Sequence, residues 1–150
     1  MSRLEFDGMK HEVTLYSAKE EKIGTWEAYN HIDSRMKMHH IPDRTYIMQD
    51  RSATHMHPAH PDWDTSEGKF GPYGIARFYV PGHEAIGIHS GRKNALFQPG
   101  AIHATEGCIR TTDKAMKEIH DLMQFDSLST ITIINNLPKK TIHSKSKGAK

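Results

Sequence analysis

The sequence predicts a mostly β domain of the α+β class with one principal helix. Several short runs alternate apolar and polar residues, as strands do when they bury one face. A β-branched run of strand length, 130–134, follows later in the chain. Apolar residues recur at helical spacing over residues 115–123. The length of 150 residues suits a single domain.

The first half of the chain predicts a β-hairpin, a third strand and a long loop. Residues 12–16 and 22–29 alternate in the manner of strands, and the polar stretch 17–21 separates them. Within 41–48, Pro42 fixes its own φ and drives Ile41 to extended geometry, which favours a turn before a short strand. Residues 49–74 are rich in His, Pro, Asp and Gly, so we expect a surface loop, and such loops often carry function.

The second half predicts another hairpin, the helix and a final strand. Two strand-like runs, 75–80 and 85–89, are joined at Pro81-Gly82. The helix over 115–123 has N-cap chemistry in Thr112-Asp113, and the strand 130–134 ends at the turn residues that follow it. The predicted domain therefore spans residues 1–137, and residues 138–150 form a basic tail that we expect to be disordered.

Composition excludes several classes of protein. The formal net charge of +2 is too small for a dedicated nucleic-acid binder, so we expect no nucleic-acid partner. One cysteine, Cys108, excludes an internal disulfide framework and a cysteine-based zinc site. No apolar stretch reaches the about 18–20 residues of a membrane span, and the first residues hold no signal-peptide core. We expect cytoplasmic synthesis without a Sec signal, and export by another route if the protein acts in the periplasm or cell wall.

One segment carries the residues for nucleophilic catalysis. A predicted strand ends at His89, and a Gly- and Pro-containing loop leads to Gly107-Cys108. A free thiol has a pKa of about 8.5, so it needs an imidazole nearby to take its proton, and His89 is the candidate base. Glycine before the nucleophile lets the backbone approach a substrate, and neighbouring amides can hold an oxyanion. The alternative interpretation is a buried, unreactive cysteine with an unrelated histidine.

This segment resembles the L,D-transpeptidase (YkuD-type) catalytic domain. The family signature is a histidine, a spacer, then Ser or Thr, His, Gly, Cys and an arginine two residues later. Fifteen residues, 90–104, separate His89 from Thr105, which is similar to the family spacing. Residues 41–46 resemble the family's Pro-x-Gly-x-aromatic segment, and 13–16 with 25–26 resemble its opening hairpin. The resemblance extends over residues 10–137 in the order of its patterns.

The resemblance implies a curved, mixed, barrel-like β core with the main helix after the cysteine. It implies that Cys108 is the nucleophile, His89 the base, and Ser90 the residue whose carbonyl orients His89. Gly107 and Cys108 would supply oxyanion amides. It implies a peptidoglycan partner, the stem tetrapeptide, cleaved between its diamino acid and D-Ala through a thioester. Transfer to an amine gives cross-linking or exchange, and transfer to water gives L,D-carboxypeptidase activity; no cofactor is implied.

Five further residues are predicted to bind substrate: Arg110, Glu106, His103, Arg92 and Tyr79. Arg110 matches the family arginine and would brace the site or face a substrate carboxylate. Glu106 stands where the family has its second histidine, and His103, nearby in the sequence, could restore an imidazole.

Histidines also raise a metal hypothesis. His55, His57 and His60, followed by Asp62 and Asp64, are ligand types that suit zinc. Because Pro58 and Pro61 interrupt the segment and it matches no tight motif, we favour a solvated or substrate-lining loop, and we expect no metal requirement.

Two other functions remain open at the sequence level. The same chemistry would serve an antibacterial effector delivered by a type VI-like apparatus, with an immunity protein as partner. The other possible function is that of a non-catalytic module that binds cell wall or zinc. This function is favoured if Glu106 abolishes catalysis at the site.

Overall fold

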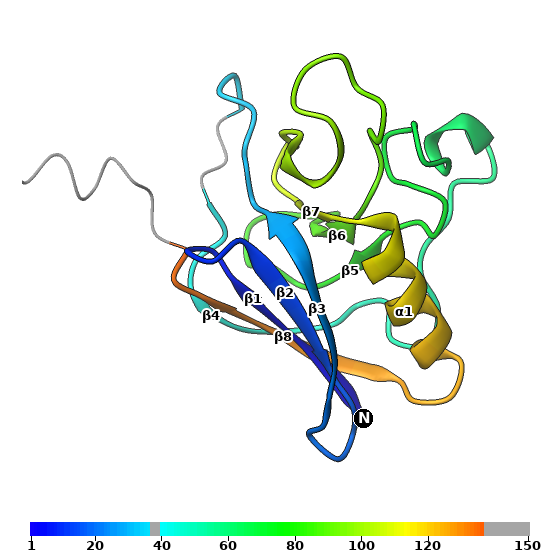
Figure 1. Ribbon diagram of the computed structural model, residues 1–150. Helices are drawn as coiled ribbons and strands as arrows, with labels where there is room; N and C mark the ends of the chain where they lie inside the picture. Colours follow the sequence, from blue (N-terminus) through cyan, green and yellow to red (C-terminus); the bar gives the residue numbers. More distant parts are fainter. Residues whose placement is uncertain (37–39, 137–150) are drawn as a thin grey trace, which may run out of the picture.

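The computed structural model describes residues 1–36 and 40–136 (Figure 1). In this part of the chain eight strands form one curled mixed sheet in the order β4-β8-β1-β2-β3-β7-β6-β5. The strands are β1 Ser2–Asp7, β2 Glu12–Tyr16, β3 Lys22–Tyr29, β4 Arg44–Ile47, β5 Ala76–Arg77, β6 Gly87–His89, β7 Ile109–Thr111 and β8 Leu128–Ile134. The helix is α1, Asp113–Met123, and two 3-10 turns are η1, Pro61–Trp63, and η2, Gly100–Ile102. The predicted fold class is confirmed.

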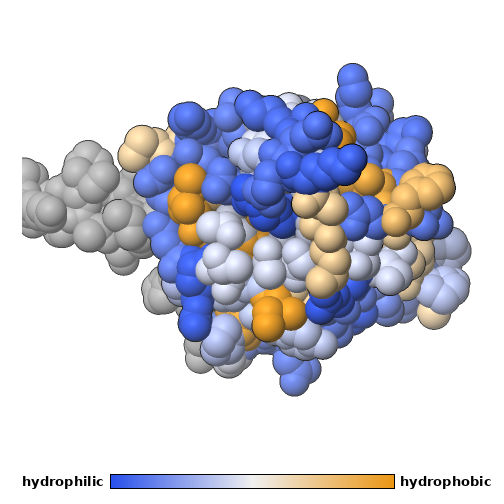
Figure 2. Space-filling view, turned by 90° about the horizontal axis from the view of Figure 1, so that it is seen from below, coloured by the Kyte–Doolittle hydropathy of each residue, from blue (hydrophilic) through white to orange (hydrophobic). Residues whose placement is uncertain are grey.

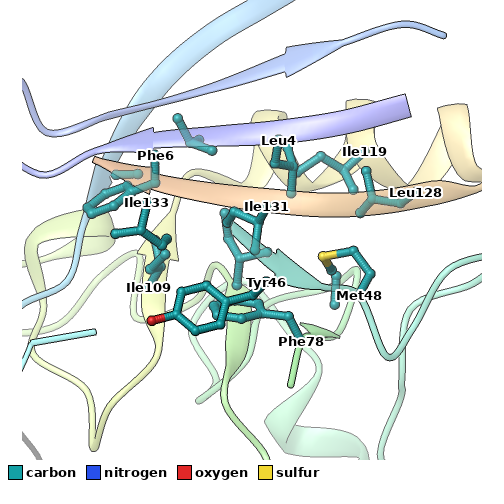
Figure 3. Close-up of a cluster of buried hydrophobic side chains, with 14 of the residues drawn as sticks. Leu4, Phe6, Tyr46, Met48, Phe78, Ile109, Ile119, Leu128, Ile131 and Ile133 are labelled. Atoms are coloured by element: carbon teal, nitrogen blue, oxygen red, sulfur yellow. The ribbon is translucent and has the colours of Figure 1, made fainter. Parts of the chain in front are cut away.

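The strand β1 lies inside the sheet, although the sequence analysis did not predict it. It pairs antiparallel with β2 and parallel with β8. Leu4 and Phe6 alternate with half-buried residues, so one face of β1 points into the core. Figure 3 shows the core between this face and the loops beneath it. Its buried members include Leu4, Phe6, Tyr46, Met48, Phe78, Ile109, Ile119, Leu128, Ile131 and Ile133.

The second hairpin is confirmed but is shorter than predicted. β5 and β6 pair antiparallel, yet β5 ends at Arg77 because Phe78 turns inward and bridges to Met48. Tyr79 then faces outward and is 59% exposed. A further short strand that was not predicted, β7, joins β6 in parallel and β3 antiparallel. It connects the two halves of the sheet and directly follows Cys108.

The first hairpin, β2–β3, the strand β4 and the final strand β8 are confirmed, and so is the helix. The side chain of Thr112 caps α1 by accepting from the amide of Ala115 at 3.1 Å, as the N-cap chemistry predicted. Four apolar residues of α1 are buried, namely Ala115, Met116, Ile119 and Met123. The segment 49–74 is a loop apart from η1 and one bridge to Ile75. The predicted tail, 138–150, lies outside the described residues.

The surface carries no large apolar face in the view of Figure 2, where hydrophobic residues form separate small patches between hydrophilic ones. Of the helices that the structure describes, none combines the length and apolar character needed to cross a membrane.

Candidate active site

The pairing of β6 with β7 brings the predicted base and nucleophile together. His89 is the last residue of β6, and Cys108 directly precedes β7. The two strands run parallel, with Ile88 opposite Ile109. Both His89 and Cys108 consequently line one cavity of about 460 Å³.

A backbone carbonyl fixes the ring of His89. The Nδ1 atom lies 2.9 Å from the Ser90 carbonyl oxygen, and the side chain is buried. Because a carbonyl only accepts, Nδ1 carries the proton in this bond and Nε2 of the neutral ring keeps its lone pair. Burial lowers the pKa of His89 to about 3, and the charge of Arg110 acts in the same direction. The ring is therefore a neutral proton acceptor at neutral pH.

Cys108 is half-buried, and its thiol is neutral at rest. Its Sγ lies 3.6 Å from the Ala85 carbonyl oxygen, to which the thiol donates. Burial raises the pKa of Cys108 to about 11, Glu106 also raises it, and the Gly87 amide lowers it. The thiolate form of Cys108 and the imidazolium form of His89 are thus both disfavoured at neutral pH.

The turn before Cys108 is held by Thr105. The Thr105 hydroxyl donates to the Cys108 carbonyl at 2.7 Å and accepts from the Gly107 amide at 3.1 Å. Gly107 has φ +151°, which favours glycine. Since its amide is occupied in this conformation, the predicted oxyanion role of Gly107 is not supported by this geometry. The Cys108 amide remains the candidate donor.

Asn30, which the sequence analysis missed, ties this turn to the sheet. It is buried just beyond β3, and its Nδ2 donates to the Gly107 carbonyl at 3.0 Å and the Cys108 carbonyl at 3.1 Å. Its Oδ1 accepts from the Ile41 amide and from Asn136 Nδ2, each at 2.9 Å. All four hydrogen-bonding positions of the amide are used. No local sequence pattern signals such a role, because the partners are distant in the chain.

Arg110 braces the site. The guanidinium is buried and donates to four carbonyl oxygens, those of Ser90 at 3.2 Å, His103 at 2.9 Å, Ala104 at 3.2 Å and Lys69 at 3.0 Å. Burial lowers the pKa of Arg110 to about 10, so it stays charged at neutral pH. Of the two roles predicted for this arginine, the geometry favours bracing over contact with a substrate carboxylate.

Three other predicted substrate-binding residues line the same cavity: Arg92, His103 and Glu106. Lys69 and Arg92 add positive charge to its wall, whereas Glu84 and Glu106 add negative charge. The His103 ring is engaged by the carbonyls of its own loop at 3.1 and 3.2 Å. The cavity therefore offers charged groups of both signs beside the thiol.

Tyr79 lies elsewhere. It lines a neighbouring hollow of about 570 Å³, which shares Glu84 and Ala85 with the cavity. The structure does not bring Tyr79 together with the other predicted residues, because the chain turns outward after Phe78.

The three histidines of the long loop do not converge. Within residues 1–36 and 40–136, no three His, Cys, Asp or Glu side chains form a group that could hold a metal ion. His57 instead pairs with Asp64, with 2.9 Å between Nδ1 and Oδ1. The loop therefore supports a different interpretation from the zinc hypothesis, developed below.

The site thus consists of a buried histidine oriented by a carbonyl and a cysteine that lines the same cavity, on a curled β-sheet. Residues 17–141 match the model of the YkuD family, the L,D-transpeptidase catalytic domain. The chain belongs to this family of enzymes. No curated protein matches the chain.

Three solved structures share the fold. Bd1075 of Bdellovibrio bacteriovorus has a TM-score of 0.63 and 15% identity, over 99% of this chain and 53% of that one. An L,D-transpeptidase (Yku) from Stackebrandtia nassauensis has a TM-score of 0.58 and 12% identity, over 91% and 57%. An L,D-transpeptidase from Xylanimonas cellulosilytica DSM 15894 has a TM-score of 0.51 and 14% identity, over 88% and 59%. The chain thus spans little more than half the length of these proteins, and identities this low show the fold alone.

Proposed function

We propose that this chain is a peptidoglycan L,D-transpeptidase in which Cys108 cleaves the bond between the diamino acid and D-Ala of stem tetrapeptides. The observation that carries the proposal is the hydrogen bond from His89 Nδ1 to the Ser90 carbonyl, 2.9 Å, in a cavity that Cys108 shares. This bond leaves Nε2 as the proton acceptor, which is the one group a neutral thiol needs. Family membership supports the substrate class.

The reaction follows from these positions. The Cys108 proton moves to His89 Nε2 as Sγ attacks the carbonyl carbon, and the Cys108 amide faces the resulting oxyanion. Collapse breaks the peptide bond, and Nε2 returns the proton to the departing D-Ala amine. The thioester then passes its acyl group to an amine, which gives a cross-link or exchange, or to water, which gives a tripeptide. Arg110 holds the Ser90 carbonyl in place throughout.

Incubation with a defined disaccharide tetrapeptide, with and without a D-amino acid acceptor, tests the proposal by mass spectrometry of the products. We expect exchange or tripeptide product from the wild type, and a loss of at least about a thousandfold in Cys108→Ala. Phe125→Leu is the control, since Phe125 is exposed and lies outside the cavity. Wild-type product formation by Cys108→Ala would refute the nucleophile.

The same assay separates the two alternatives that the sequence left open. A non-catalytic module would give no product and a thiol that does not react with iodoacetamide. An effector would give the same products, and a cognate immunity protein would bind it and block turnover.

A further inference from the structure

The loop segment 66–71 runs against the residues that follow His89. Three backbone bonds join the two segments, from Ser90 N to Phe70 O at 3.1 Å, from Arg92 N to Gly68 O at 2.9 Å, and from Lys93 N to Ser66 O at 2.9 Å. At Gly71, with φ +86°, a Cβ would collide with the Ser90 hydroxyl. The contact is therefore close along its whole length, and it places Phe70 beside the predicted base.

The Phe70 ring stands between His89 and His57. Its edge contact with His89 has a centroid separation of 4.9 Å and an interplanar angle of 66°. On the His57 side the rings are stacked, with 4.3 Å between centroids and an angle of 19°. One phenyl ring thus packs against both imidazoles.

His57 is itself held rigidly. Asp64 accepts from the His57 amide at 2.6 Å through Oδ2 and contacts the ring Nδ1 at 2.9 Å through Oδ1. The side chain of Asp64 is 7% exposed and that of His57 is 15% exposed. The buried Asp64 carboxylate therefore fixes both the backbone and the ring of His57. The face of the His57 ring that stacks on Phe70 is consequently held in one orientation.

One hydrogen bond at Nδ1 does not fix the tilt of an imidazole ring, and packing has to set the direction of Nε2. We propose that Phe70, backed by His57 and Asp64, is a positioning residue that aims His89 Nε2 at the Cys108 thiol. This inference rests on the proposed function of His89 as the base. It gives the long histidine-rich loop a role that involves no metal.

Phe70 also keeps water from one side of His89. Burial is the main reason that the pKa of His89 is lowered, and the positive charges of Arg110 and Lys69 act in the same direction. A smaller side chain at position 70 would admit water to the ring. The pKa of His89 would then rise toward its ordinary value, and the aim of Nε2 would loosen.

The first test compares Phe70→Leu with Phe70→Tyr in kinetics on the tetrapeptide. A loosely aimed base slows the chemical step, so we expect kcat to fall by about 10–100-fold in Phe70→Leu with KM within about twofold of wild type. Phe70→Tyr keeps the ring edge and should stay within about threefold of wild type. Phe125→Leu is again the control, because Phe125 is an exposed aromatic residue outside the cavity. An increase in KM alone in Phe70→Leu would make Phe70 a substrate contact and overturn the proposal.

A double-mutant cycle tests the support from His57. His57→Ala should lower kcat by less than Phe70→Leu does, because His57 acts through the phenyl ring. Once the Phe70 ring has been removed, substituting His57 should lower kcat no further. The double variant should therefore have the same kcat as Phe70→Leu alone. Fully additive losses would contradict this part of the inference. His57→Ala also keeps the inference testable if Phe70→Leu fails to fold.

A measurement without substrate separates this inference from the proposed function. Long-range ¹H–¹⁵N NMR of the His89 ring should show Nδ1–H and a bare Nε2 in the wild type across the neutral range. In Phe70→Leu, we expect mixed tautomers and protonation at a pH at least about one unit higher. Identical ring spectra and titrations in the folded variant and the wild type would overturn the positioning role. Failure of the wild type to turn over muropeptides would instead refute the proposed function and leave the NMR result standing.

Discussion

The two halves of the sheet are held together by different interactions. The strands β4, β8, β1, β2 and β3 have four to eight residues each and share the apolar core. The strands β7, β6 and β5 have only two or three residues each. Around them, polar side chains such as Asn30 and Arg110 bond to loop carbonyls.

The contrast distinguishes the interactions that stabilise the fold from those that fix the geometry of the candidate site. Burial of apolar surface dominates the free energy of folding but does not hold an atom in one direction. Hydrogen bonds to carbonyl oxygens are directional, and they occur where the site needs fixed angles. Substitutions of core residues should therefore lower stability, whereas substitutions of the polar side chains around the second half should also lower activity per folded molecule.

The largest expected effect on stability is at Phe6, in β1. Phe6→Ala should lower the free energy of unfolding by about 3–5 kcal/mol, because it deletes a fully buried ring from the core. Urea denaturation measures this loss, and turnover per folded molecule should be unchanged. A loss of specific activity in the folded fraction would break the separation between the halves.

Asn30→Ala should affect both quantities. It removes the hydrogen bonds that Asn30 makes to the Gly107 carbonyl and the Ile41 amide, and one of the two to the Cys108 carbonyl, which costs about 1–3 kcal/mol in unfolding free energy. Because it frees the turn that carries the nucleophile, kcat should fall by about tenfold or more. Asn94→Ala is the matched control, since Asn94 is exposed and its side chain donates to Glu67 on the surface. A stability loss with unchanged kcat would show that the network has no part in positioning Cys108.

The smallest effect is expected at Glu106, where the chain departs from the family signature. Its negative charge disfavours the thiolate, so Glu106→Gln should lower the pKa of Cys108. The shift should stay below about one unit, because Glu106 is exposed and solvent screens it. The rate of iodoacetamide reaction against pH measures the shift, with Glu67→Gln as control. A shift to higher pH would contradict the electrostatic assignment.

The sequence predicted those elements that have a long internal pattern. The hairpin β2–β3, the helix α1 and the strand β8 each repeat their apolar residues often enough to set a period. In β1 the pattern has only Leu4 and Phe6, and in β7 it has only Ile109 within three residues. These two strands form because they pair with other strands of the sheet, and a short local pattern does not indicate which segments will pair.

The residues of the candidate site also fall into two groups, those that a sequence pattern indicates and those that it does not. His89, Ser90 and Cys108 were predicted because their spacing resembles a family signature. His89 and Cys108 line one cavity, and the Ser90 carbonyl accepts from His89 Nδ1. Asn30 and Phe70 act through contacts that join distant segments, so no spacing marks them. Tyr79 lines the neighbouring hollow, and its predicted contact with substrate stays a prediction.

The position of β1 has a consequence for how the chain reaches this fold. Its two neighbours, β2 and β8, come from opposite ends of the described sequence. During synthesis one edge of β1 stays unpaired until β8 has been made, and an open edge bearing Leu4 and Phe6 invites association with other chains. Contacts so distant in sequence also slow folding, since a long loop must close before the pairing stabilises it. A truncation before β8 would remove the strand that pairs with both β4 and β1, and it would leave these two edges unpaired.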